Sequence, residues 1–195
     1  MKTLKLTRNV FLLTFLLLSS WNTVIAQDQK VVLSESKLTV FGTSNLHDWD
    51  IEAKAMSGKS NFVIVSNVLT SIENLEFAVE SEQLLSGKSG MDSNTFKALN
   101  SKKYKTINYK LTKVNKITKV SANSYSVETQ GDLTISGLSK NITQTFTVVV
   151  SGKKIIISGK TKINMTQYKI VPPTALFGTI KTGPEVTIDF KVTYN

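Results

Sequence analysis

Residues 186–194 have the sequence VTIDFKVTY, in which apolar and polar side chains alternate strictly. Successive side chains of a β-strand point to opposite faces, so this alternation predicts a strand with one apolar face. The same period of two occurs in residues 75–80, 107–112 and 145–150. Apolar and β-branched runs predict further strands at residues 37–42, 49–55, 61–66, 124–135 and 154–164.

Residues 92–100 depart from this pattern and predict a short helix. Asp92 or Ser93 is a suitable N-cap, and Phe96 and Leu99 lie on one face of a helix at this spacing. Glycine-containing turns are expected between the strands, at residues 57–58, 136–137, 151–152 and 182–184.

About eight antiparallel strands with one apolar face each must bury those faces against one another. The pattern alone is equally compatible with a sandwich and with a closed barrel, which removes the free edges. The interior of a soluble eight-stranded barrel is filled by side chains or holds one small ligand. Since no repeat or linker interrupts the pattern, residues 27–195 are predicted to form one domain.

Composition excludes several kinds of site. The 195 residues include no Cys and one His, which excludes disulfides, thiolate zinc sites, a Cys nucleophile and a polyhistidine metal centre. No Ser lies in a nucleophile-elbow setting. We therefore expect a protein that is not an enzyme, with no catalytic residues, no bound metal and no cofactor.

The N-terminal residues have the pattern of a secretory signal peptide. Lys2, Lys5 and Arg8 precede an apolar run at residues 10–18, and Val24 and Ala26 suit the −3 and −1 positions of a cleavage site. The alternative is a membrane anchor, but the run is shorter than the ~20 residues of a spanning helix. We predict cleavage after Ala26 and a periplasmic or secreted product.

The formal net charge is +10, and Arg8 is the only arginine. The lack of arginine after the leader disfavours nucleic-acid binding, because arginine is the preferred side chain for phosphates and guanine edges. Residues 101–120 include seven lysines and no acidic residue. This stretch is either a solvated strand face or a surface that meets an anionic membrane.

Four segments together resemble the YceI-like family, the lipid- and polyisoprenoid-binding proteins of bacterial envelopes. They are FGTSNLHDW at residues 41–49, the helix and its exit at 91–107, GDLTISG leading to Asn141-Ile142, and residues 172–190. The resemblance implies an antiparallel eight-stranded lipocalin-like barrel with one helix packed against it. It also implies an elongated apolar cavity for an isoprenoid quinone, a polyisoprenoid or a fatty acid derivative.

Strand alternation and this resemblance together give the candidate site residues. The side chains expected to line the cavity and contact lipid are Phe62, Ile64, Phe77, Val79, Tyr109, Leu111, Phe146, Val148, Ile157, Phe190 and Val192. Members of the family often have Phe in place of Tyr109, so we expect a narrower or more polar tunnel here. If it is buried, the phenol needs a hydrogen-bond partner.

The candidates for the cavity mouth and the lipid head group are His47, Trp49, Tyr168 and Phe177. Alternatively, His47 makes turn hydrogen bonds, Trp49 fills core and Phe177 plugs one end of the barrel. An exported lipid carrier is the favoured function. The alternative is an envelope structural or stress-related interaction protein with a filled barrel.

Overall fold

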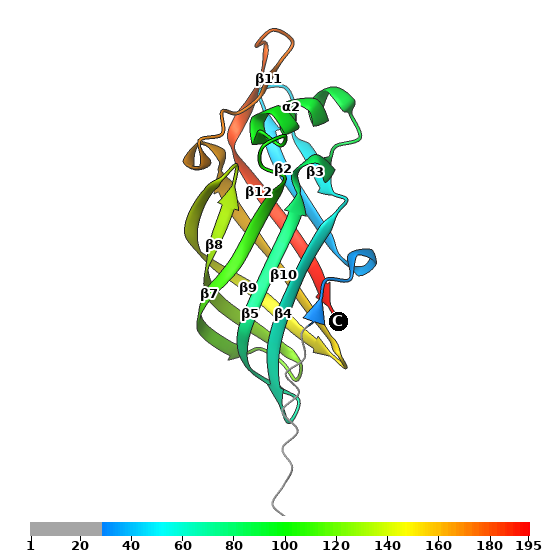
Figure 1. The fold of residues 1–195 in the computed structure, drawn as a ribbon, viewed down its shortest axis with the longest axis vertical. Coiled ribbons are helices and arrows are strands. Elements are labelled where there is room, and N and C mark those ends of the chain that lie inside the picture. Colours follow the sequence, from blue (N-terminus) through cyan, green and yellow to red (C-terminus); the bar gives the residue numbers. More distant parts are fainter. Residues whose placement is uncertain (1–28) are drawn as a thin grey trace, which may run out of the picture.

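The computed structural model describes residues 29–195, so the predicted signal peptide lies outside the described residues. These residues form a curled antiparallel sheet that is taller than it is wide, with one α-helix at one end (Figure 1). The lipocalin-like, mostly β architecture expected from the sequence is confirmed.

Eight strands of eight to fifteen residues form the wall of the barrel in the described part of the chain. They are β2 (Lys37–Ser44), β4 (Met56–Val65), β5 (Val68–Glu80), β7 (Thr106–Lys119), β8 (Ser124–Ile135), β9 (Leu138–Ser151), β10 (Lys154–Asn164) and β12 (Ile180–Tyr194). The strand predicted at residues 49–55 is β3 (Trp49–Ala53), and the prediction omitted three shorter strands, β1 (Gln29–Lys30), β6 (Leu84–Leu85) and β11 (Thr174–Ala175). A strand of two residues is too short to show alternation.

The two ends of the described chain meet in the wall. The strand order is β1-β4-β5-β7-β8-β9-β10-β12-β2-β3-β6, so β12 pairs with β2. Beside this pair, residues 29–32 connect the two edges of the curl. The Val31 amide donates to the Gly58 carbonyl of β4 at 3.1 Å, and the Val32 amide donates to the Thr193 carbonyl of β12 at 2.8 Å.

Helix α2 (Ser89–Leu99) covers one end of the barrel, which we call the helix end (Figure 1). The helix begins at Ser89, so neither Asp92 nor Ser93 is its N-cap. Instead, the Asp92 carboxylate accepts hydrogen bonds from the Ser86 amide at 2.7 Å and the Ser86 hydroxyl at 2.6 Å. The 3₁₀ turns η3 (Ser81–Gln83) and η4 (Met165–Tyr168) also lie next to strand ends here, and η2 (Leu33–Glu35) precedes β2.

Two of the predicted turns lie inside strands. Residues 182–184 form a bulge in β12, where the pairing with β2 shifts between Thr182 and Val186. A bulge tolerates Pro184, which has no amide to donate. Gly58 lies within β4, where an added Cβ would come 2.3 Å from the Glu76 carbonyl oxygen, so here glycine permits close strand approach. The predicted turn at Ser136–Gly137 joins β8 to β9, with positive φ at both residues.

The inward side chains form two clusters, one at each end of the barrel. The helix-end cluster includes Leu38, Leu133 and Ile163, and the far-end cluster includes Val148 and Tyr194. Burial raises the pKa of the Tyr194 phenol far above its usual value. No helix in residues 29–195 has both the length and the hydrophobicity to cross a membrane.

We predict that Tyr125→Phe raises the free energy of unfolding by about 1 kcal/mol. Tyr125 is 1% exposed, and its hydroxyl has no hydrogen-bond partner among the described residues. Removing a buried, unsatisfied hydroxyl removes its desolvation penalty. Urea denaturation measures the change. The control is Tyr109→Phe, which removes a hydroxyl bonded to Thr129 and should lower stability. An unchanged or lower free energy of unfolding in Tyr125→Phe contradicts the prediction.

Candidate functional site

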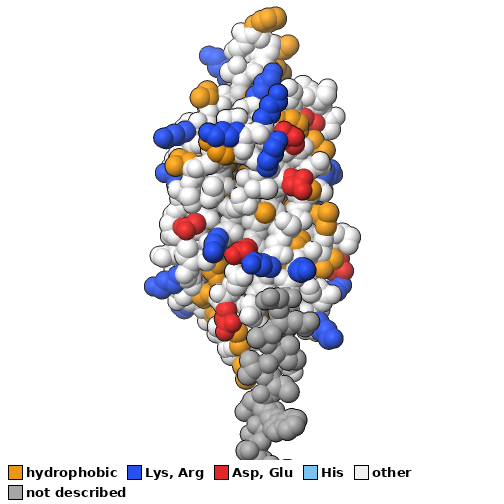
Figure 2. Space-filling model, in the orientation of Figure 1, with side chains coloured by type: hydrophobic (Ala, Val, Ile, Leu, Met, Phe, Trp, Pro, Cys, Tyr) orange, Lys and Arg blue, Asp and Glu red, His pale blue; other side chains and the backbone are white. Residues whose placement is uncertain are grey.

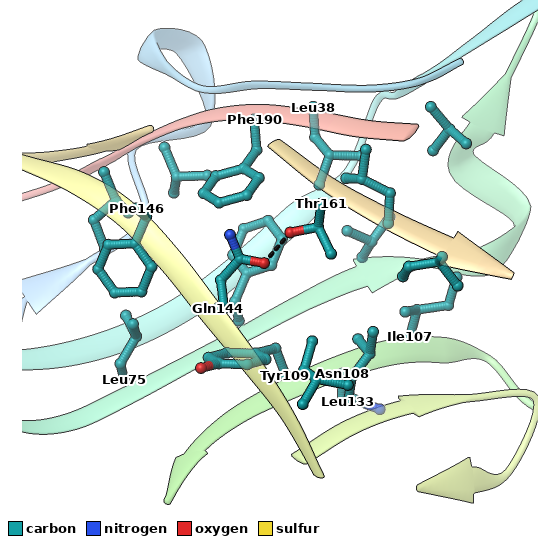
Figure 3. Close-up of a pocket in the computed structure, with 18 of the residues that line it drawn as sticks. Leu38, Leu75, Ile107, Asn108, Tyr109, Leu133, Gln144, Phe146, Thr161 and Phe190 are labelled. Carbon is teal, nitrogen blue, oxygen red and sulfur yellow. Dashed lines mark hydrogen bonds between the residues drawn. The ribbon is translucent and has the colours of Figure 1, made fainter. Parts of the chain in front are cut away.

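A hollow of about 140 Å³ lies inside the barrel, between the two core clusters (Figure 3). Its walls are inner faces of the long strands other than β4, and its surface is almost entirely hydrocarbon. The lining residues are Leu38, Val40, Leu75, Phe77, Val79, Leu84, Ile107, Asn108, Tyr109, Leu133, Ile142, Gln144, Phe146, Ile157, Thr161, Ile163, Ile188, Phe190, Val192 and Tyr194.

Seven of the eleven predicted lining residues border this hollow: Phe77, Val79, Tyr109, Phe146, Ile157, Phe190 and Val192. The other four belong to the far end of the barrel. Phe62 and Val148 are buried in the far-end cluster, and Ile64 and Leu111 pack against it. The inner space there is already occupied by Tyr125 and Tyr194, which are fully buried.

Two polar residues that face the hollow were missed by the sequence reasoning. Gln144 alternates with Ile142 and Phe146 on β9, and Thr161 alternates with Ile163 on β10. The period of two places both side chains on the inner face once β9 is extended back from the predicted residues 145–150, but only apolar side chains were predicted to line the cavity. Their neighbours on the same strands were the available signal.

Gln144 and Thr161, on the neighbouring strands β9 and β10, bond to each other in the wall of the hollow (Figure 3). The Thr161 hydroxyl donates to Gln144 Oε1, and Gln144 Nε2 donates to the Thr145 carbonyl at 2.7 Å. Because a buried polar group is costly without a partner, this pairing is what allows both side chains to face an apolar interior.

Tyr109 has the partner that a buried phenol requires. Its hydroxyl lies 3.1 Å from Thr129 Oγ1, which in turn donates to the Gln144 carbonyl at 3.0 Å. Burial raises the pKa of Tyr109, and the Thr129 bond opposes this rise. The phenol is therefore neutral at physiological pH and contributes one more polar group to the wall.

Aromatic rings lie directly against glycines at two places in the wall. A Cβ added at Gly131 would come 2.3 Å from Tyr109 Cζ, and one added at Gly159 would come 2.9 Å from Phe190 Cζ. Each ring thus occupies the space that a side chain on the neighbouring strand would fill. This arrangement keeps the rings beside the backbone and leaves the middle of the barrel open.

A surface groove of about 960 Å³ lies at the helix end. It is bordered by α2, the β2–β3 loop and the β11–β12 hairpin, and its lining includes His47, Trp49 and Phe177. The Trp49 ring lies over Gly42, and its indole N–H donates to the Thr43 carbonyl at 3.0 Å. Three of the four predicted mouth residues therefore gather at one place.

Tyr168 is separate from the groove. It is buried in the helix-end cluster, and burial raises the pKa of its phenol. His47 makes turn hydrogen bonds, because its amide donates to Ser44 Oγ at 3.1 Å and its Nδ1 lies 2.8 Å from the Asp48 carbonyl oxygen. The ring contacts that carbonyl rather than the Asp48 carboxylate. Within residues 29–195, no cluster of His, Asp and Glu is placed to hold a metal ion.

We predict that Gly131→Ala lowers the free energy of unfolding by about 1–3 kcal/mol, because the new methyl group displaces the Tyr109 ring. In Tyr109→Leu the same glycine change should be less costly, which a double-mutant cycle in urea detects. The matched control is Gly90→Ala in α2, where an added Cβ meets nothing within 4 Å. If Gly131→Ala lowers the free energy of unfolding equally in the wild type and in Tyr109→Leu, contact with the Tyr109 ring is not the cause of the loss.

Comparison with known proteins gives a matching family and several similar solved structures. The YceI-like domain matches residues 24–194, and a search of curated proteins gives no match. BcnA of Burkholderia cenocepacia is similar in structure, with a TM-score of 0.65 and 17% identity over 84% of this chain and 98% of that one. A polyisoprenoid-binding domain from Saccharophagus degradans, implicated in plant cell wall breakdown, has a TM-score of 0.64 and 13% identity over 86% of this chain and 97% of that one.

The YceI protein of Campylobacter jejuni has a TM-score of 0.55 and 20% identity, over 72% of this chain and 80% of that one. At these identities the solved structures establish a common fold. The family match covers nearly all of the described residues, including the barrel, the hollow and the helix end. The chain therefore belongs to the YceI-like family.

Proposed function

We propose that this protein binds a long-chain amphiphilic lipid inside its barrel and sequesters or carries it. The ligand class is an isoprenoid quinone, a polyisoprenoid or a fatty acid derivative. The observation that carries the proposal is the hydrocarbon-lined hollow in the middle of the barrel. Membership of a family of binding proteins supports it, as does the fold shared with the polyisoprenoid-binding domain of Saccharophagus degradans.

Hydrocarbon burial alone supplies a useful affinity. About ten buried methylene groups contribute ~8 kcal/mol before the costs of ordering, which corresponds to a micromolar dissociation constant. The barrel therefore needs few specific contacts with the chain of its ligand. The polar head group fits the groove at the helix end, where His47 and Trp49 lie.

The hollow has to enlarge to hold a long chain. Its 140 Å³ is close to the ~150 Å³ of a cavity that accepts benzene, and it is smaller than the ~300–1,000 Å³ of typical ligand sites. The additional space must come from side-chain movement, for which the rings of Phe146 and Phe190 are candidates. The same small volume favours the second candidate function, an interaction protein with a filled barrel.

We also propose that residues 1–26 direct export and that the protein acts in the periplasm or outside the cell. A long-chain lipid is nearly insoluble in water, so we further propose that the protein exchanges it at an anionic membrane surface. An N-terminus at Gln27 in protein purified from the host envelope would support the export proposal. A retained leader would contradict it.

Mass spectrometry of that same preparation tests the lipid proposal. Native spectra should show one long-chain lipid per protein, and solvent extraction followed by denaturing analysis should identify its class. Protein that carries no lipid and takes up no fluorescent long-chain probe would overturn the proposal in favour of a filled barrel.

We predict that Val40→Phe weakens binding of a fluorescent fatty acid at least about tenfold, the loss expected when two or more methylene groups no longer fit. Val40 is half-buried and lines the hollow, so the larger ring occupies the space of the ligand. The matched control is Val68→Phe at the β4–β5 turn, which should bind like the wild type. Equal losses in both variants would place the probe outside the hollow. Urea denaturation shows that each variant is folded.

A further inference from the structure

The β11–β12 hairpin projects beyond the rest of the helix end (Figure 1). At its tip, Leu176 is 67% exposed and Phe177 is fully exposed. Figure 2 shows hydrophobic side chains at this protruding tip and lysines on the surface below it. Two adjacent large apolar side chains at the outermost point of a protein are exposed to water at a cost, which indicates a partner.

The hairpin is built to hold these side chains away from the barrel. Leu176 and Phe177 have positive φ angles of 48° and 56°, which are uncommon for residues other than glycine. The base of the hairpin is fixed by Asn45 of the β2–β3 loop. Its Oδ1 accepts from the Lys181 amide at 2.7 Å, and its Nδ2 donates to the Thr179 carbonyl at 3.0 Å. The tip is therefore a supported projection.

The groove beside the tip leads toward the hollow. Trp49, Met91 and Met165 line the groove, and each also packs against the helix-end cluster. Val40 and Ile188 pack against the same cluster and line the hollow. The layer between groove and hollow thus contains two methionines, whose unbranched side chains rearrange readily.

The charged residues that line the groove suit an anionic surface. Lys88 and Lys97 line the groove, and none of its described lining residues is acidic. The lysine-rich strand β7 is different, since its charges extend along the barrel and are partly paired with glutamates. Lys110 lies 3.7 Å from Glu76, and Lys105, just before β7, lies 3.9 Å from Glu82. This arrangement favours a solvated strand face for that stretch.

We propose that the helix end docks on an anionic membrane. Leu176 and Phe177 enter the acyl region, Lys88 and Lys97 meet the head groups, and the groove opens onto the lipid surface. The purpose of docking rests on the proposed lipid cargo, whereas docking itself does not require a cargo. A membrane suits this tip better than a protein partner does. Two apolar side chains are enough to insert into fluid lipid, whereas a stable protein interface buries ~1,200 Å² or more, far more than the tip covers.

The test measures binding of the protein, residues 27–195, to vesicles of phosphatidylglycerol and phosphatidylcholine in equal parts. Replacing both tip residues, Leu176→Ser with Phe177→Ser, should weaken vesicle binding at least about tenfold, because two apolar side chains no longer leave water. The matched control is Val120→Ser at the β7–β8 turn of the opposite end, since Val120 is also 67% exposed. The control should bind like the wild type.

Two further measurements locate the contact. Lys88→Gln with Lys97→Gln should weaken binding to the anionic vesicles at low salt and reduce its salt dependence. Phe177→Trp is made together with Trp49→Phe, so that position 177 has the only tryptophan in residues 27–195. The fluorescence of this tryptophan should be quenched by lipids with brominated acyl chains.

Equal vesicle binding by the tip variant and the wild type, or an unquenched Trp at position 177, overturns the docking proposal. A tip-dependent dimer in sedimentation, without vesicle binding, also overturns it in favour of a second copy as the occupant. Cargo is assayed separately by extraction from the tip variant. Vesicle binding by protein that carries no lipid and takes up no fluorescent long-chain probe would contradict the proposed function and leave docking intact.

Discussion

Burial of the inner face of one curled sheet holds this molecule together. Side chains alternate along each strand, so eight long strands present a continuous apolar surface that only curling can remove from water. The curl in turn creates an interior whose two ends are filled by separate clusters. The middle is filled less completely, because the Tyr109 and Phe190 rings lie against glycines of adjacent strands. The hollow is thus a direct result of where the sequence places glycine.

Much of the fold was predictable from the sequence, because period-two alternation is a local signal. The observed bounds of β8 and β10 are those predicted, residues 124–135 and 154–164. Strand β7 was predicted over residues 107–112 and continues to Lys119, because bulges after Leu111 and Val114 interrupt the alternation. The helix was predicted at nearly the right place, but its start depends on contacts of Asp92 with the preceding loop, which propensity does not encode.

The site was predictable to a smaller extent. Alternation identified inward aromatic residues, but it did not show how far along the barrel each lies, so it did not separate the hollow from the far-end cluster. Alternation places Gln144 and Thr161 on the inner face, but the hydrogen bond that stabilises them there joins two strands and is visible only once β9 and β10 are aligned. Likewise, the sequence was compatible with Phe177 either plugging the barrel end or lying at the cavity mouth. In the structure the left-handed backbone at the hairpin tip turns its side chain out into solvent.

The pairing of β2 with β12 has a consequence for the order of folding. The first long strand of the domain needs the last one as its neighbour, and residues 29–32 bond to the final residues of the chain. Hairpins such as β7–β8–β9 need only local contacts and can form while synthesis continues. Closure has to wait until residue 195 is available, so until then the growing chain exposes the apolar face that later surrounds the hollow. A chaperone that shields this face during synthesis would act on a state that exists only before the last strand arrives.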